Sequence, residues 1–150
     1  MKAAVLFYFV FSTFFFFSQT NGSYDAELAN KLGADEYGMK KYVFCILKTG
    51  KNSSATPEEK QKLFEGHMNN INKLAKEKKL VLAGPFMKND KDYRGLFILN
   101  CETIDEAIKL VETDPAVHAK LLEAELIPWY GTAALGVTIE THEKILKKKP

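Results

Sequence analysis

His67 lies among apolar side chains, in a stretch whose spacing predicts a helix. Thr56, Pro57 and Glu59 form a helix start, with a capping threonine, a proline at the first position and a glutamate that can close a capping box. Apolar residues then recur at helical spacing and gather into one stripe, formed by Leu63, Phe64, Met68, Ile71, Leu74 and Ala75. Because His67 falls inside this stripe, it is either a neutral core histidine or a titratable group aimed into a cavity.

Asp114 is the second residue with a use in chemistry, and it also has an ordinary structural role. It precedes Pro115, so it can cap a helix whose first residue is the proline, and this role is sufficient to explain both residues. His118 and His142 lie on short polar stretches and are expected at the surface. The three histidines have no Cys or carboxylate at ligand spacing, so the sequence predicts no metal site.

Three further residues could line a pocket for a small molecule. Gly84 and Pro85 could shape its rim by letting backbone come close, although the end of a strand explains them equally well. Trp129 and its neighbour Tyr130 close an apolar segment. Packing in the core or at an interface is the favoured interpretation of these rings, and a wall that stacks on a planar ligand is the alternative.

The composition favours a globular chain and argues against some partners. The 150 residues are 46% hydrophobic and 27% charged, with a formal net charge of +2. This balance gives no reason to expect a nucleic-acid or membrane partner. The sequence has neither a Gly-rich phosphate loop nor any other feature that calls for a cofactor.

The first 20 residues have the layout of a secretory signal peptide. A single lysine, Lys2, precedes an apolar run from Ala3 to Phe17, and small or polar residues follow. The run is shorter than the about 20 apolar residues that span a bilayer. We therefore expect a cleaved leader, a secreted or periplasmic protein and no stable membrane insertion. Cys45 and Cys101 lie in strand-like segments, where buried free thiols are commoner than a bridge.

The remaining chain predicts an α+β domain of the ferredoxin-like type. A helical extension or linker over 21–40 precedes a domain over 41–132, and an amphipathic tail covers 133–150. Within the domain the expected order is β-α-β-β-α-β, with an antiparallel sheet. The strands are expected at 42–47, 80–86, 93–101 and 124–132, the helices at 56–79 and from 103, and a short helical turn that starts at Asp114-Pro115 and runs through Val117 to Leu122.

The predicted strands are apolar on both faces of the sheet. The segments VFCIL, LVLA and LFIL do not alternate apolar with polar residues, whereas a sheet with one wet face should. Two helices cover only one face. The other face must be buried by a second subunit, by an enclosed cavity or by both, and we interpret it as the interface of a homodimer.

Several segments, in this order and spacing, resemble the YCII-related family of the dimeric α/β-barrel superfamily. They are YVFCILKTG, GHMNNINKLAKEKKL, LVLAGPF, RGLFIL, ETIDEAIKLVETDPAV and ELIPWY, which together span roughly 41–132. The resemblance implies the ferredoxin-like fold and a dimer that packs sheet on sheet. It also implies a His-Asp dyad near the dimer barrel, which by position falls on His67 and Asp114. The signal peptide and both terminal extensions depart from the simple family form.

These observations lead to two hypotheses of function. The family that the chain resembles has a related member that is a dehydrochlorinase acting on a chlorinated aromatic ring compound. The wider superfamily includes lactone isomerases. A dyad without a Ser or Cys nucleophile suits proton abstraction and return, so the first hypothesis is a cofactor-independent lyase or isomerase with His67 as acid and base. The alternative is a non-catalytic homodimer that binds a small molecule or serves a structural role.

Overall fold

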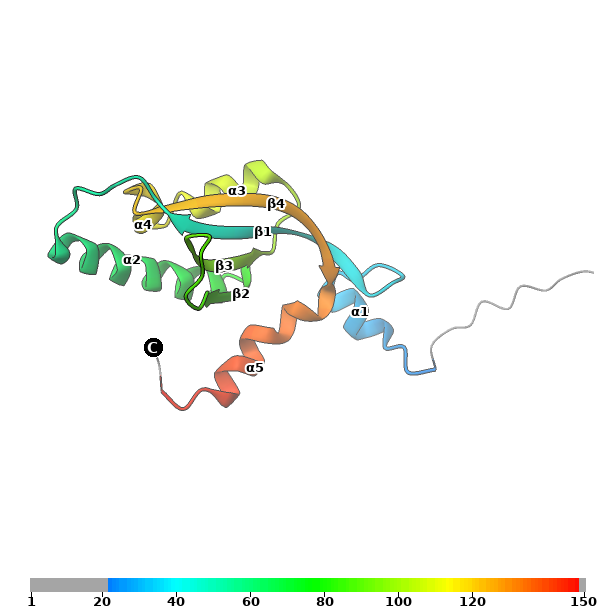
Figure 1. Ribbon diagram of the computed structural model, residues 1–150. Helices are drawn as coiled ribbons and strands as arrows, with labels where there is room; N and C mark the ends of the chain where they lie inside the picture. Colours follow the sequence, from blue (N-terminus) through cyan, green and yellow to red (C-terminus); the bar gives the residue numbers. More distant parts are fainter. Residues whose placement is uncertain (1–21, 149–150) are drawn as a thin grey trace, which may run out of the picture.

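A four-stranded antiparallel sheet forms the centre of the structure, a computed structural model that describes residues 22–148. The strand order is β2-β3-β1-β4, which together with the element order confirms the predicted ferredoxin-like topology (Figure 1). The elements are α1 (Ala26–Leu32), β1 (Met39–Thr49), α2 (Pro57–Lys76), β2 (Leu80–Pro85), β3 (Tyr93–Leu99), α3 (Ile104–Val111), α4 (Pro115–His118), β4 (Leu122–Thr132), the 3-10 helix η1 (Ala133–Val137) and α5 (Thr138–Ile145).

The predicted signal peptide lies outside the residues that the structure describes. Within 22–148, none of the helices has the length and apolar character needed to cross a bilayer.

Helix α2 begins as its sequence predicts. The hydroxyl of Thr56 accepts from the backbone N–H of Glu59 at 3.2 Å, and the Glu59 carboxylate accepts from the N–H of Thr56 at 2.8 Å. This capping box satisfies N–H groups that have no partner inside the helix. The helix buries His67 and Leu74 on the side that faces the sheet.

The pair formed by β1 and the edge strand β4 extends beyond the predicted ends. Strand β1 begins at Met39, before the predicted start at residue 42, and Met39 to Lys41 pair with Tyr130 to Thr132 of β4. At the other end Thr49 pairs with Leu122, two residues before the predicted start of β4. Lys40 and Lys41, at the start of β1, do not fit an alternation of apolar and polar residues. The backbone hydrogen bonds of an antiparallel pair do not require such an alternation.

The helix-covered face of the sheet holds the main core. Alternate residues of β1, namely Val43, Cys45 and Leu47, are buried in it together with Phe97 of β3. The core is completed from the helices and connections by Leu74, Ala107, Leu110, Val111 and Ala116. Cys45 and Cys101 are buried free thiols, as the sequence indicates.

The chain itself covers part of the second face, where the sequence argument assigned the cover to a partner or a cavity. Tyr42, Val81 and Ile98 are buried there and pack with Leu135 of η1. Thr138 donates its hydroxyl to the carbonyl of Val81, which ties the start of α5 to β2. The sequence predicts the tail only as a short amphipathic segment, and its role as a cover for the sheet corrects that prediction.

Helix α1 and η1 lie together at one end of the sheet, opposite the end that carries α4, and α5 runs back from there and contacts β2 (Figure 1). Helix α1 ends at Gly33, whose φ of 68° is the left-handed conformation that glycine adopts at helix ends. Leu32 lies against Gly136 of η1. A Cβ added to Gly136 would be 3.0 Å from Cδ2 of Leu32. The extensions therefore pack on each other and on the domain.

Candidate active site

His67 and Asp114 are in direct contact, although 47 residues separate them in the chain. Nδ1 of His67 lies 2.6 Å from Oδ2 of Asp114. The aspartate is fully buried, and the histidine side chain is 11% exposed. An ionised carboxylate can only accept, so this contact requires a proton on Nδ1 and leaves Nε2 as the basic nitrogen of the neutral ring.

Asp114 divides its two oxygen atoms between a helix cap and the histidine. Oδ1 accepts from the backbone N–H of Ala116 at 2.9 Å and of Val117 at 3.4 Å, which caps α4. Oδ2 faces His67. The predicted cap and the pairing implied by the resemblance therefore coexist on one residue. The helix begins at Pro115 as predicted, but it ends at His118, before the expected end at Leu122.

A glycine lets α2 come close enough to α4 for this contact. A Cβ added to Gly66 would lie 2.8 Å from Cγ of Pro115, so close that α2 or the proline would have to move. Gly66 and Pro115 flank the dyad residues His67 and Asp114 in sequence. Any larger residue at position 66 would therefore act directly on the geometry of the dyad.

The imidazole of His67 is packed between aromatic rings. It stacks on Phe97 with ring centroids 5.8 Å apart and an angle of 22°, and Phe64 meets it edge-on at 6.0 Å. Nε2 has no hydrogen-bond partner among the described residues. Within that part of the chain, the one polar side-chain atom that is both sealed from solvent and unpartnered is Nδ2 of Asn70. Nε2 therefore retains contact with solvent.

The thiol of Cys45 belongs to the surroundings of Asp114 but is unsuited to nucleophilic attack. Burial raises the pKa of Cys45 to about 12, and the negative charge of Asp114 adds to this shift. A thiol must lose its proton to become a nucleophile, so Cys45 remains a neutral core residue near neutral pH.

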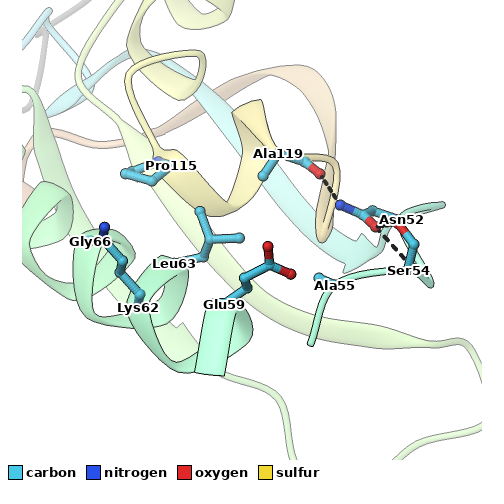
Figure 2. A pocket seen from close by; sticks show the side chains of 9 residues that line it. All are labelled: Asn52, Ser54, Ala55, Glu59, Lys62, Leu63, Gly66, Pro115 and Ala119. Carbon is cyan, nitrogen blue, oxygen red and sulfur yellow. Dashed lines mark hydrogen bonds between the residues drawn. The ribbon is translucent and has the colours of Figure 1, made fainter. Parts of the chain in front are cut away.

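An open groove runs beside the dyad, between α2, α4 and the loop that joins β1 to α2. Its volume is about 590 Å³, and Leu63 and Glu59 of α2 face Ala119 and the loop across it (Figure 2). Asn52 fastens the loop by donating from Nδ2 to the carbonyl of Ala119 at 2.9 Å. The lining residues are Asn52, Ser54, Ala55, Glu59, Lys62, Leu63, Gly66, Pro115 and Ala119.

Neither dyad side chain lines this groove, whereas their sequence neighbours Gly66 and Pro115 do. A second groove of about 400 Å³ lies between α3, α4 and β4, and it is likewise not lined by His67 or Asp114. Among residues 22–148, no three His, Cys, Asp or Glu side chains cluster in a way that could hold a metal ion.

The predicted pocket residues lie apart from the dyad within one chain. Trp129 packs on Tyr42 and Phe44, on the face opposite the one that holds Phe97 and His67. Gly84 and Pro85 end β2, at the sheet edge farthest from β4. The structure thus brings His67 and Asp114 together but does not assemble the other three around them, and their role in ligand binding stays a prediction.

Sequence reasoning missed a second polar contact between the same segments. Thr113 precedes Asp114, and its hydroxyl lies 3.0 Å from the amide of Asn70, which follows His67 by three residues. Asn70 is 7% exposed. The available signal was a polar side chain one turn from His67 on the same side of a helix.

Comparison with known proteins identifies a family and solved structures that are similar to this chain. Residues 42–130 match the YCII-related domain. The 5-chloro-2-hydroxyhydroquinone dehydrochlorinase from Burkholderia phenoliruptrix, solved with 2,5-dihydroxybenzoquinone, is 24% identical, with a TM-score of 0.41, over 58% of this chain and 92% of its own. No curated protein sequence matches the chain significantly. Since the matched segment is more than half of the chain, this protein belongs to the YCII-related family.

Proposed function

We propose that this protein is a lyase or isomerase that needs no cofactor, with His67 as general acid and base and Asp114 as its positioning residue. The observation that carries the proposal is that the two ring nitrogens of His67 have different surroundings. Nδ1 is committed to a buried carboxylate at 2.6 Å, while Nε2 is unpartnered among the described residues and reaches solvent. This is the arrangement that a proton-transferring histidine requires.

The proposed chemistry starts with the removal of a proton from an acidic C–H group of a small molecule. Nε2 takes the proton, and the Asp114 carboxylate stabilises the imidazolium that forms. The electron pair of the broken C–H bond either expels a leaving group, which is elimination, or shifts along the substrate before the proton returns to another carbon, which is isomerisation. Neither route requires a nucleophilic Ser or Cys.

We further propose that the protein is exported and that it acts as a homodimer formed through the second face of the sheet. Besides the residues covered by η1, this face carries half-buried Phe44 and Leu96, and Ile127 and Trp129 are 40% and 36% exposed. Ile127 pairs with Phe44 across β1 and β4, so these apolar residues are contiguous. A second copy would remove them from water.

A non-catalytic homodimer that binds a small molecule or serves a structural role is the second candidate. The observation that favours it is the packing of His67, which stacks on Phe97 and lines neither groove. In this case the His67–Asp114 contact would fasten α4 to α2 without moving protons, and a ligand would occupy a groove from which the dyad is absent.

The first experiment determines the tautomer of His67 by NMR on protein labelled with ¹⁵N-histidine. We expect the Nδ1–H form of the neutral ring, because the Asp114 carboxylate accepts that proton. Asp114→Asn keeps an oxygen for the cap of α4 but removes the charge, so the preference for Nδ1–H should weaken. Exposed His118 and His142 serve as internal references. A wild-type ring protonated on Nε2 would rule out the dyad.

A second experiment tests the chemistry without knowledge of the natural substrate. The protein is incubated in D₂O with a panel of hydroxylated ring compounds and lactones that carry an acidic C–H bond. Proton abstraction predicts deuterium incorporation or loss of a leaving group, abolished in His67→Gln and preserved in His118→Gln. Equal activity of the His67→Gln protein would exclude the proposed role, and binding without exchange would favour the non-catalytic candidate.

A further inference from the structure

A second polar contact, between the buried side chain of Asn70 and the hydroxyl of solvent-exposed Thr113, joins the elements that carry the dyad. Asn70 lies one turn after His67 on α2, and Thr113 immediately precedes Asp114. Their contact of 3.0 Å therefore runs beside the 2.6 Å contact of the dyad. Residues three apart on a helix lie on the same side, so the two contacts form a double link between α2 and the segment before α4.

Thr113 is itself held firmly by the end of α3. Its hydroxyl donates to the carbonyl of Leu110 at 2.7 Å, and its backbone N–H reaches the same carbonyl at 3.3 Å. A hydroxyl has a single proton, which Leu110 takes because a carbonyl can only accept. Thr113 therefore satisfies Asn70 best as an acceptor, with the amide turned so that Nδ2 donates to the hydroxyl oxygen.

This arrangement makes a continuous chain from the end of α3 through Thr113 to α2. It also gives a partner to Nδ2 of Asn70, the atom otherwise sealed and unpartnered within residues 22–148. A buried amide donor without a partner loses the hydrogen bonds that it makes to water in the unfolded chain, so the turned orientation is favoured.

We propose that Asn70 and Thr113 are positioning residues of the dyad. Their hydrogen bond fixes the turn before α4 against α2, so that the carboxylate of Asp114 meets Nδ1 of His67 in one orientation. Neither residue needs to touch a substrate, and each acts through its neighbour in the dyad. The inference rests on the proposed function only in so far as the dyad moves protons.

The test compares Thr113→Val, which keeps the shape but removes the hydroxyl, with Thr113→Ser, which keeps the hydroxyl. Each full-length variant is examined by the NMR tautomer measurement on His67 and by urea unfolding. We expect Thr113→Val to lose the Nδ1–H preference in folded protein and Thr113→Ser to retain it. Asn70→Ala should resemble Thr113→Val, while Asn69→Ala, at the exposed neighbouring position, should resemble the wild type.

The outcomes separate this inference from the proposed function. If the wild-type ring lacks the Nδ1–H form, the dyad itself fails. If the wild type has it and Thr113→Val and Asn70→Ala keep it despite lower stability, the pair is merely structural and the inference is overturned. Should Thr113→Val not fold, Asn70→Ala decides the question. Where a substrate is known, the positioning role predicts a fall in kcat of up to about 100-fold, restored in Thr113→Ser.

Discussion

Gly66 of α2 is in contact with Pro115 of α4, so closely that an added Cβ would lie 2.8 Å from Cγ of the proline. These residues are direct sequence neighbours of His67 and Asp114. The spacing of the two helices at this point therefore sets the distance across the dyad. A glycine in a helix is normally unfavourable, and here the need for close approach explains it.

Gly66→Ala should strain the dyad despite a better helix propensity. Alanine favours a helix by about 1 kcal/mol over glycine, but overpacking costs about 1–3 kcal/mol. We expect the free energy of unfolding in urea to fall by up to about 2 kcal/mol, together with a weaker Nδ1–H preference of His67.

Two comparisons isolate the steric cause. Asn69→Ala on the exposed side of α2 should not destabilise the protein. Pro115→Ala removes Cγ, so the double variant should lose less stability than the sum of the single variants. Strict additivity of Gly66→Ala and Pro115→Ala would contradict the steric explanation.

Cys45 should resist thiol reagents in the folded protein. Burial and the charge of Asp114 raise the pKa of Cys45 from its ordinary value to about 12. In a Cys101→Ser background, the modification rate at pH 8 should be far below that of the urea-unfolded chain. Asp114→Asn removes the negative charge and should lower the pKa of Cys45.

The same shift predicts the direction of a pH effect on stability. A thiol whose pKa is raised by folding contributes its stability in full below the unfolded value, and this contribution declines as the pH rises towards about 12.

Cys101, whose pKa of about 11 is raised by burial and by Glu106, serves as the control for thiol reactivity in a Cys45→Ser protein. If Asp114→Asn altered the thiol reactivity of Cys101 as much as that of Cys45, the proposed effect of the Asp114 charge on nearby Cys45 would be refuted.

Tyr130 and Asp35 should titrate as a linked pair where β4 meets the N-terminal connection. The Tyr130 hydroxyl donates to the Asp35 carboxylate, which raises the pKa of Tyr130 to about 12 and lowers that of Asp35. In an ultraviolet titration, Asp35→Asn should move the ionisation of Tyr130 to lower pH. In an NMR titration, Tyr130→Phe should move Asp35 to higher pH.

Glu36→Gln tests whether that effect is specific. Glu36 is the next carboxylate in the chain and acts on Tyr130 only through its charge, so its removal should shift the tyrosine less than Asp35→Asn does. Both groups are exposed, and we expect little effect on stability from either change. An equal shift in the two variants would mean that the hydrogen bond is not the main cause.

The fold could be predicted because its signals are local. Thr56 and Glu59 form a capping box within four residues, and the apolar strands require cover on both faces. The pairing of His67 with Asp114 could not be derived in this way, because 47 residues separate the two and only the resemblance linked them. Each residue also had a sufficient local explanation, one in a helical stripe and the other as a cap.

Features that depend on tertiary packing were not predictable from the sequence. The approach of Gly66 to Pro115 and the contact of Asn70 with Thr113 exist only after α2 and α4 are in place. The cover that Leu135 gives to the second face likewise exists only after the tail that follows β4 has folded onto the sheet. In each case the sequence contains the residue type but not the surface that it meets.

The apolar remainder of the second face leads to a test of the proposed homodimer. Ile127 of β4 is 40% exposed and lies opposite Phe44, whereas Ile108 of α3 is 39% exposed and lies away from this face. The two isoleucines are therefore matched in type and exposure. Ile127→Glu would bury a charge in a sheet-to-sheet interface at a cost of several kcal/mol, and Ile108→Glu would leave its charge in water.

Sedimentation equilibrium of the protein without residues 1–20 should give a dimer for the wild type and for Ile108→Glu but a monomer for Ile127→Glu. Circular dichroism should show that all three proteins are folded, since both positions are solvent-accessible in a single chain. A monomeric wild type at about 100 μM would be evidence against the dimer. A dimeric Ile127→Glu protein would place the interface elsewhere, because no sheet-to-sheet contact through this face could accommodate an unpaired carboxylate at its centre.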